Sequence, residues 1–338
     1  MAELFAGLLG QEQAVALLSA ALAQGRLAPA YLFSGPEGVG RRLAALRFLE
    51  GVIAGGGGSL PLRRRLEAGN HPDLLWVEPT YSDKGQLVPL SQAEAAGVSR
   101  KAPPQLRLEQ VRGVSAFLAR RPVEAARCLV VLDGAEAMAE GAANALLKTL
   151  EEPGDGLLIL LSAAPERLLS TIRSRCQTIP FARLPAPLLQ QVLARAGAAA
   201  AMEPAPACPD PPELLELAAG SPGALLRHRQ HWQALPEGLA ERCSTLLASG
   251  QAAAAARGGR GEPSPLEALA LARDVCEALE VEQQLWLLDW WQIHLWRSRP
   301  DPVPLQRLER LRRQLRSFVQ PRLAWEVALL ELSGVRLG

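Results

Sequence analysis

A glycine-rich stretch, GPEGVGRR at 35–42, follows the apolar run AYLFS at 30–34. Glycines at this spacing let backbone N–H groups surround anionic oxygens at a helix start, while a following lysine adds charge and a Ser or Thr holds Mg²⁺. Here Arg41 replaces the lysine and Arg42 replaces the hydroxyl residue. The glycines that would surround a phosphate are Gly35, Gly38 and Gly40. The spacing indicates a phosphate loop that has kept its backbone and lost its side chains; a plain strand-to-helix turn is the alternative.

The side chains around this loop decide whether it could support hydrolysis. Arg41 can attract phosphate, but a planar guanidinium does not replace a compact ammonium in a tight loop, and Arg42 cannot bind a metal ion. Asp133 ends the apolar run CLVVL at 128–132, as the metal-side aspartate of an ATPase does, but Gly134 follows where a glutamate would polarise water. Asp133 either retains metal binding or caps the turn. We expect no hydrolysis, no bound cofactor and no metal here.

The segment Ser174-Arg175-Cys176 offers a different kind of chemistry. An arginine is always charged, so its guanidinium can stabilise the negative charge that builds on a transferring phosphoryl group. Taken alone, Arg175 is more simply a surface arginine, because other arginines stand nearby in this segment. Cys176 is interpreted as a small packed thiol, since nothing near it in sequence would activate it.

These residues need a scaffold, and the apolar runs predict a sheet. The runs are AYLFS (30–34), DLLWV (73–77), CLVVL (128–132), LLILL (157–161) and QTIPF (177–181). They alternate with helical segments at about 106–119 and 141–151, which is the pattern of a parallel sheet covered by helices. Two stretches, 55–61 and 78–105, show no persistent period, so we expect loops there, the second a mobile insertion.

The sequence after Phe181 predicts helices only. A helical pattern at about 185–197 precedes the proline-rich turn at 204–212 and a short helix, which together indicate a small helical domain. Leucine-rich and alanine-rich helices follow beyond residue 230 and predict a bundle. One of them, 305–318, carries on one face Leu308, Leu311, Leu315 and Phe318.

Composition limits the classes of protein that remain. The 338 residues, 49% of them hydrophobic, are enough for more than one core. The net charge of +1 means that any nucleic-acid contact would come from a local patch. The five cysteines include no C-x-x-C pair, which argues against a zinc site. No run approaches the ~18 apolar residues of a membrane span, so we expect a cytoplasmic protein without membrane contact.

Longer motifs carry a resemblance to a known family. NALLKTLEEP at 144–153 and LLILLSAAPERLLSTIRSRCQTIPF at 157–181, together with AYLFSGPEGVG and GNHPDLL at 69–75, resemble the bacterial clamp-loader AAA+ subunits. The resemblance implies a P-loop NTPase-like α/β AAA+ domain followed by a helical lid and an all-α collar. The implied boundaries are 1–182, with the insertion 78–105, then 183–230 and 231–338.

The resemblance also implies a branch of the family. The missing lysine, hydroxyl and glutamate, and Gly223 where the family's sensor-2 arginine stands, favour the non-hydrolysing delta-prime branch. In the family's SRC motif, which Ser174, Arg175 and Cys176 match, the arginine reaches the ATP of a neighbouring subunit. The implied role of Arg175 is thus that of an arginine finger acting in trans. Many members carry a four-cysteine zinc module that this chain lacks, so no zinc is expected.

The implied assembly is a hetero-oligomer within the DNA polymerase III holoenzyme. Its partners would be the gamma/tau motor subunits, which bind ATP, the delta subunit and, through the assembly, the sliding clamp and primer-template DNA. Two alternatives stay open. An active gamma/tau-type ATPase would hydrolyse ATP alone, whereas a DNA-binding protein that reuses the fold would depend on the basic stretch 305–316.

Overall fold

The computed structural model describes residues 3–83, 85–93, 95–98, 103–200, 210–246, 265–298, 300–317 and 319–333. The chain divides into two compact units. One comprises Met1–Met202 with Gly220–Gly223, and the other comprises Glu203–Ala219 with Ala224–Gly338. The first unit carries the sheet, and the described residues of the second are helical or connecting. The expected division of the helical part into a lid at 183–230 and a collar at 231–338 stays a prediction.

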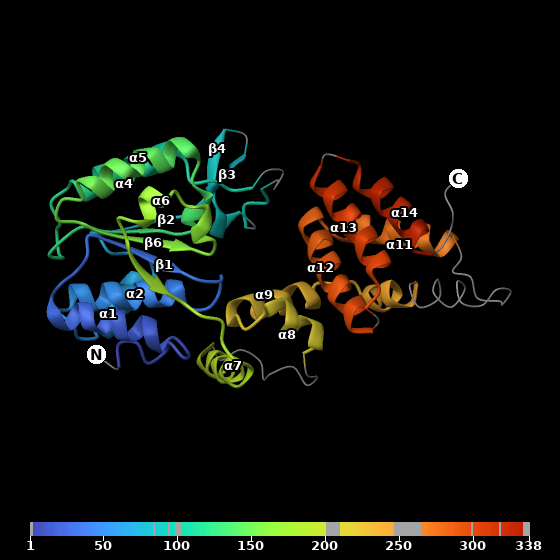
Figure 1. The fold of residues 1–338 in the computed structure, drawn as a ribbon, viewed down its shortest axis with the longest axis horizontal. Coiled ribbons are helices and arrows are strands. Elements are labelled where there is room, and N and C mark those ends of the chain that lie inside the picture. The colour runs from blue at the N-terminus through green and yellow to red at the C-terminus, as the bar shows by residue number, and fades with distance from the viewer. Residues whose placement is uncertain are drawn as a thin grey trace. The chain divides into compact units, whose positions relative to one another are not determined.

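A five-stranded parallel sheet forms the centre of the first unit (Figure 1). In spatial order its strands are β2 (Leu74–Val77), β5 (Leu129–Leu132), β6 (Leu157–Ser162), β1 (Ala30–Ser34) and β7 (Gln177–Pro180). Every residue of β5 and β6 is buried, because helices cover both faces of a parallel sheet and its central strands are therefore apolar throughout. The predicted α/β fold, a parallel sheet with flanking helices, is confirmed.

Two pairs of helices cover the sheet on opposite faces (Figure 1). On one side lie α1 (Glu12–Gln24) and α2 (Arg41–Ile53), and on the other α4 (Leu108–Leu118) and α5 (Glu140–Glu151). The short helices of this unit are α3 (Leu60–Glu67) and α6 (Ser170–Arg173), and α7 (Ala186–Ala200) follows the sheet. This layering brings the carboxyl ends of β1 and β5 to one edge of the sheet, where the residues with candidate chemistry stand.

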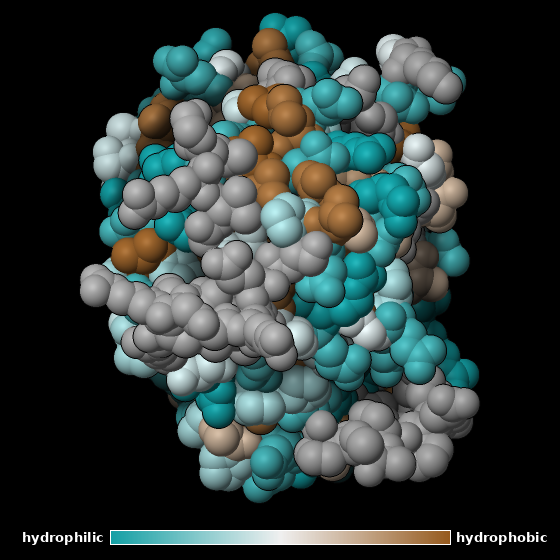
Figure 2. Space-filling model, turned by 90° about the vertical axis from the view of Figure 1, so that its right-hand side faces the viewer, coloured by the Kyte–Doolittle hydropathy of each residue, from teal (hydrophilic) through white to brown (hydrophobic). Residues whose placement is uncertain are grey.

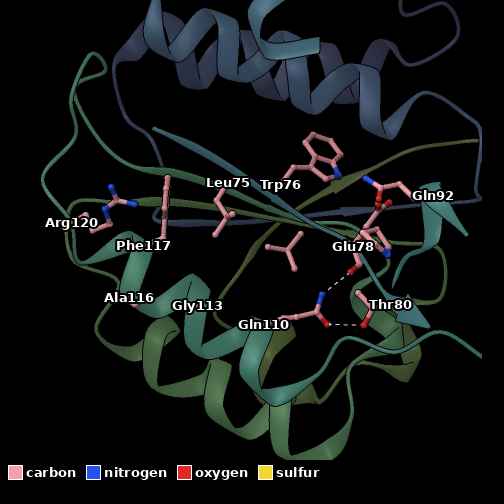
Figure 3. A pocket seen from close by; sticks show the side chains of 12 residues that line it. Leu75, Trp76, Glu78, Thr80, Gln92, Gln110, Gly113, Ala116, Phe117 and Arg120 are labelled. Carbon is pink, nitrogen blue, oxygen red and sulfur yellow. Dashed lines mark hydrogen bonds between the residues drawn. The ribbon is translucent and has the colours of Figure 1, made fainter. Parts of the chain in front are cut away.

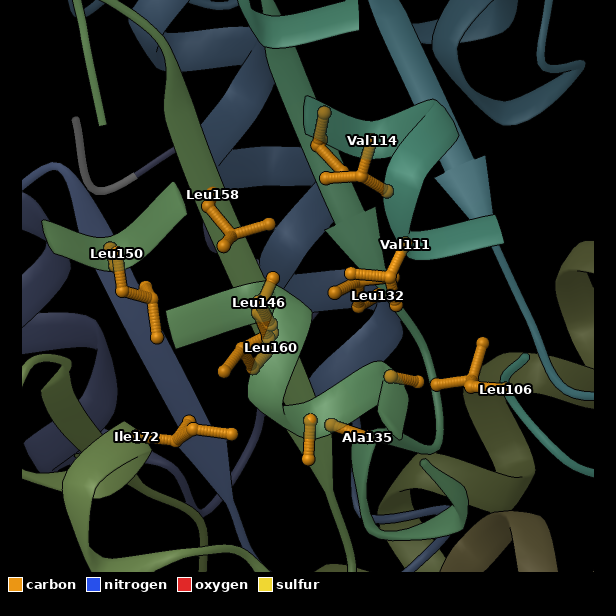
Figure 4. Packing of buried hydrophobic residues seen from close by; sticks show 14 of the residues in the cluster. Leu106, Val111, Val114, Leu132, Ala135, Leu146, Leu150, Leu158, Leu160 and Ile172 are labelled. Carbon is orange, nitrogen blue, oxygen red and sulfur yellow. The ribbon is translucent and has the colours of Figure 1, made fainter. Parts of the chain in front are cut away.

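The core between the sheet and the α4/α5 layer is aliphatic (Figure 4). Leu132 and Leu160 from the sheet meet Val111 from α4 and Leu146 from α5, and all four side chains are fully buried. Burial of one such side chain stabilises the fold by about 1.5–3 kcal/mol. The carboxyl ends of β5 and β6 and the end of α5 are therefore held on a rigid scaffold.

The prediction of loops without structure at 55–61 and 78–105 was partly wrong. Helix α3 begins at Leu60, and the second stretch contains β3 (Thr80–Asp83) paired antiparallel with β4 (Gln86–Pro89), followed by the 3-10 turn η1 (Leu90–Gln92). Gly85 takes a positive φ of 83° in the hairpin turn. Four-residue strands are too short to show a period in sequence. The hairpin is tied to the chain that returns to α4, because Thr80 and Gln105 exchange two backbone hydrogen bonds.

The second unit is a helical assembly. Its elements include α8 (Pro212–Ala218), most of α9 (Pro222–Gln233), α11 (Pro265–Ala278), α12 (Val281–Ser298), α13 (Pro302–Arg316) and α14 (Pro321–Leu332). Trp291 and Trp325 are fully buried, and the Trp325 indole Nε1–H donates to Gln284 Oε1 at 2.9 Å. The predicted apolar face of α13 is confirmed by the burial of Leu308, Leu311 and Leu315. Phe318, the fourth residue of that face, lies outside the described residues.

Candidate functional site

The loop between β1 and α2 has the path that its glycines predicted. Gly35, Gly38 and Gly40 have φ angles of 154°, 78° and 108°. A Cβ atom on Gly35 would stand 2.3 Å from the Phe181 carbonyl oxygen, and one on Gly40 would stand 2.9 Å from Leu8 Cδ2. The loop therefore needs glycine at these positions for both backbone conformation and space.

Gln11 is a supporting residue that the sequence did not reveal. Its buried side-chain amide donates to the backbone carbonyls of Val39, at 3.3 Å, and Ala182, at 2.8 Å, while its carbonyl oxygen accepts the Ala182 N–H. These bonds tie the loop to the chain that leaves β7. A glutamine just before a helix gives no local signal of such a role, because its partners lie 28 and 171 residues away.

Arg41 turns inward from the start of α2. Only 8% of the residue is exposed, and two guanidinium nitrogens, Nε and Nη1, are buried without a hydrogen-bond partner among the described residues. Burial lowers the pKa of Arg41, and the charges of Glu136, Asp133 and Glu37 oppose this effect. Nearby carboxylates thus offset part of the cost of burying the guanidinium, and burial remains the larger effect.

Arg42 faces the carboxylate that would hold a metal ion in an ATPase. Its Nη1 lies 3.6 Å from Asp133 Oδ2, and its guanidinium carbon lies 4.4 Å from the ring centroid of Trp76. Burial raises the pKa of Asp133, although Arg42 and Arg41 pull it in the other direction. Within the described ranges, no cluster of three or more His, Cys, Asp or Glu side chains is placed to hold a metal ion.

Gly134 and Glu136 are the residues near Asp133 that concern the absent water-polarising glutamate. Gly134 has a φ of 63°, and a Cβ atom there would stand 3.0 Å from Pro79 Cγ. Glu136 is directed elsewhere, because its Oε1 accepts the backbone N–H of Ala163 at 3.0 Å, just beyond the end of β6. Its carboxylate is therefore engaged with the end of the sheet.

Residues 220–223 lie directly on the loop. Ser221 Oγ donates to the Glu37 carbonyl at 2.6 Å, and the Gly223 N–H donates to the Gly38 carbonyl at 3.0 Å. A Cβ atom on Gly223 would stand 2.8 Å from Gly38 Cα. Any side chain at position 223 would therefore push the segment away from the loop.

Arg175 has no contact with the residues around the phosphate loop among those described above. It follows α6, where its Nη2 pairs with Glu151 Oε1 at 2.8 Å and its Nη1 donates to the Thr171 carbonyl at 3.1 Å. Its side chain remains 37% exposed. Ser174 Oγ donates to the same carbonyl. Burial raises the pKa of Cys176 to about 12, so its thiol is neutral near pH 7 and packs against the core.

The basic stretch in α13 is largely paired with carboxylates. Arg312 lies between Asp289 and Glu309, with Nη2 2.5 Å from Asp289 Oδ1, and Arg313 also faces Glu309. Arg310 pairs with Glu331, 3.6 Å away. Arg312 thus links α13 to α12 and Arg310 links it to α14, whereas the pairing of Arg313 with Glu309 lies within α13. The DNA-binding alternative for this stretch stays a prediction.

Comparison with known proteins then places the chain. Residues 10–185 match the model described as DNA polymerase III, delta subunit, and residues 187–332 match cyanobacterial DNA polymerase III delta prime, C-terminal domain. The chain belongs to the DNA polymerase III delta-prime family. The match of residues 187–332 thus agrees with the predicted delta-prime assignment.

Individual relatives agree with this assignment. The delta' subunit of DNA polymerase III from Pseudomonas aeruginosa is 37% identical over 223 residues, which cover 62% of this chain and 58% of that one. The delta' subunit from Bacillus subtilis is 34% identical over 177 residues, 51% of this chain and 47% of that one. The gamma/tau subunit of Mycobacterium tuberculosis is 32% identical over 192 residues, 56% and 31% of the two chains. The chain spans about half the length of the delta' relatives it matches.

Solved structures also include similar chains. A gamma-subunit-related protein of DNA polymerase III from Thermotoga maritima matches with a TM-score of 0.49 and 16% identity over 95% of this chain and 99% of that one. The clamp loader delta protein of Bacillus subtilis matches with a TM-score of 0.36 and 11% identity over 95% and 99%. Among the described helices, none combines the length and the apolar character needed to cross a membrane.

Proposed function

We propose that this chain is a non-hydrolysing stator of the DNA polymerase III clamp loader, which helps to place the sliding clamp on primed DNA. The observation that carries the proposal is the pairing of Arg42 with Asp133, because a cation supplied by the protein faces the carboxylate that would otherwise bind Mg²⁺. The Asp133 carboxylate thus has a cationic partner within the protein, 3.6 Å away.

The residues present do not fit Mg-ATP. Arg41 and Arg42 supply neither the lysine nor the hydroxyl, and Glu136 is bonded to Ala163 and not directed at an attacking water. The contact of Gly223 with Gly38 leaves no room for the family's sensor-2 arginine. We therefore derive no hydrolytic step at this site, and we expect neither ATP nor zinc as a cofactor of this chain.

The chain instead contributes an arginine to a neighbour. Arg175 is partly exposed and is fixed at two points, by Glu151 and by the Thr171 carbonyl. A guanidinium held in this way is suited to stabilise charge on a phosphoryl group of ATP bound by another subunit. Arginine fingers supplied in trans are worth ~10³–10⁵ in rate in nucleotide hydrolases.

The partners follow from the family. They are the gamma/tau motor subunits, the delta subunit and, through the complex, clamp and DNA, in a cytoplasmic hetero-oligomer. Hydrophobic residues gather in a patch on the face of the molecule shown in Figure 2. In the second unit the large apolar side chains that are exposed include Trp296, at 56%, Leu266, Val303 and Leu323. Exposed apolar surface of this kind is typical of subunit interfaces.

Reconstitution tests the proposal. The isolated chain should release no phosphate from ATP, with a motor subunit as positive control. Motor and delta subunits mixed without this chain should load few clamps, and its addition should restore both clamp loading and clamp-stimulated ATP turnover. Hydrolysis by the lone chain would establish the motor alternative. Clamp loading that does not depend on the chain would contradict the stator role.

A further inference from the structure

Strand β2 forms one edge of the sheet and is unusually open. All four of its residues are partly exposed, whereas every residue of the adjacent strand β5 is buried. Leu75 and Val77 pack against the core and also line a cavity of about 620 Å³. The edge of the sheet is thus accessible from a hollow that a further chain segment could enter.

The backbone of β2 has hydrogen-bonding groups left over at this edge. The Asp73 and Val77 carbonyls accept hydrogen bonds from the backbone N–H groups of Leu129, in β5, and Asp133, just after β5, each at 2.8 Å. Since backbone groups alternate along a strand, residues 74, 76 and 78 direct theirs away from β5. Among these, the Glu78 carbonyl accepts from the Gln110 side chain at 2.9 Å. By this alternation the N–H and C=O of Trp76 point away from β5, toward the open edge of the sheet.

The side of the hollow opposite β2 is formed by α4, which presents small residues there (Figure 3). Gly113 and Ala116 are both exposed, and a Cβ atom on Gly113 would have no atom within 4 Å. Phe117 continues the apolar lining next to Leu75. The middle of the hollow is thus lined by small and apolar residues, which leave space for side chains on one face of an added strand.

Opposite charges mark the two ends of the hollow. Arg120 stands at one end, with its guanidinium carbon 5.3 Å from the centroid of Phe117, and Glu78 stands at the other, beyond Thr80 (Figure 3). Glu78 accepts a hydrogen bond from Ser91. A bound segment with a carboxylate near Arg120 and a basic side chain near Glu78 would complement both.

We propose that this hollow binds an extended segment of a partner protein as an added strand beside β2. The outward backbone N–H and C=O of Trp76 would form hydrogen bonds with the added strand, and the small residues of α4 leave room for the side chains of that strand. Arg120 and Glu78 would select an acidic and a basic residue about one strand length apart. Unprotected edge strands pair readily with other chains, which gives this surface a physical reason to be occupied. The inference is independent of the nucleotide site.

The test uses the full chain and synthetic five- to seven-residue peptides. Each peptide alternates valine and threonine between a terminal aspartate and a terminal lysine, and both end orders are made because the strand direction is not fixed. Binding is followed by NMR of ¹³C-labelled Leu75 and Val77 methyl groups. Dissociation constants of about 1 mM are expected for such short ligands. A peptide with N-methylated central residues, which cannot complete the ladder, should bind at least about tenfold more weakly.

Matched variants locate the site. Gly113→Leu should fill the hollow and weaken binding by about tenfold, whereas Gly141→Leu should leave it unchanged, because Gly141 is also helical, exposed and open on its Cβ side. Arg120→Glu should reverse the preference, so that a peptide with lysine at both ends binds better than the original. Recovery in this reversed pair would support the charge assignment.

Three outcomes would overturn the proposal. The first is the absence of any shift at Leu75 and Val77 with either peptide order at about 5 mM, well above the expected constant. The second is equal binding of the N-methylated peptide, or stronger binding of a stapled helical peptide of the same composition. The third is a concentration-dependent dimer that Gly113→Leu abolishes, because the occupant would then be a second copy of the chain.

Discussion

The phosphate loop and the SRC segment both come from ATPase chemistry, and the structure treats them in opposite ways. At the loop, Arg41 is buried near carboxylates, and Arg42 lies 3.6 Å from Asp133 although its side chain is 58% exposed. In the SRC segment, Arg175 is partly exposed and is held by an ion pair at the surface. Arg42 lies against the carboxylate that a metal ion would use, whereas Arg175 is held by a backbone carbonyl and by an exposed ion pair, and the ion pair can be exchanged for a ligand.

The largest expected effect is the loss of ATP hydrolysis at the neighbouring site when Arg175 of the SRC segment is removed. Arg175→Ala in the reconstituted loader should leave assembly intact and slow hydrolysis at the neighbouring ATP site by ~10³, because the charge on the phosphoryl group loses its partner. Single-turnover ATP hydrolysis measures this loss, and size-exclusion chromatography checks assembly. Arg173→Ala, two residues away on α6, is the matched control and should be silent. Equal rates for the two variants would refute the trans-acting role.

The second prediction concerns the stability of the contact between residues 220–223 and the phosphate loop. Gly223→Arg places a Cβ atom 2.8 Å from Gly38 Cα, so residues 220–223 must leave the loop and give up the hydrogen bonds to Glu37 and Gly38. We expect a loss of about 1–3 kcal/mol in the free energy of unfolding. Urea denaturation measures it. Gly141→Arg, at an exposed helical position, should cost nothing. If both variants were equally stable, the segment would not be fixed on the loop.

The sequence predicted the structural features that depend on a local pattern of residues, namely the strands and the glycine-rich loop. The strands were visible because buried parallel strands are continuous apolar runs, and the loop was visible because its glycines are required by its φ angles. The inward contacts were not visible. Ser221 meets Glu37 across 184 residues, and Gln11 meets Ala182 across 171, so no spacing in the sequence records them. The hairpin at 80–89 was missed because its strands are only four residues long.

A third prediction uses pH to examine the buried pair. Burial raises the pKa of Asp133, so the folded state holds this proton more tightly than the unfolded state, whose pKa is about 3.9. The contribution of Asp133 to stability is therefore greatest at low pH and declines as pH rises through the raised pKa. Asp133→Asn removes this decline, so the stability of the variant relative to the wild type should rise with pH between about pH 4 and the raised pKa.

Urea denaturation at several pH values, with both proteins in the same buffers, follows that difference. A difference that is flat over the window, or that moves in the other direction as pH rises, would show that the pairing with Arg42 outweighs burial. Either result would contradict a raised pKa for Asp133 and would leave its pairing with Arg42 as the dominant interaction.

The smallest expected effect separates position from charge at Arg175. Glu151→Gln removes the ion pair but keeps a side chain of the same length. Because both groups are well exposed, the change in the free energy of unfolding should be at most about 0.5 kcal/mol. If Glu151 orients the guanidinium, neighbouring-site hydrolysis should still fall by about two- to fivefold while assembly is unchanged. If the bond only shields Arg175 before assembly, hydrolysis should be unchanged or faster, since the guanidinium then reaches its target without breaking a contact. Thr171 holds the other side of the guanidinium through a backbone carbonyl, which the substitution leaves in place, so a loss of rate reports on Glu151 alone.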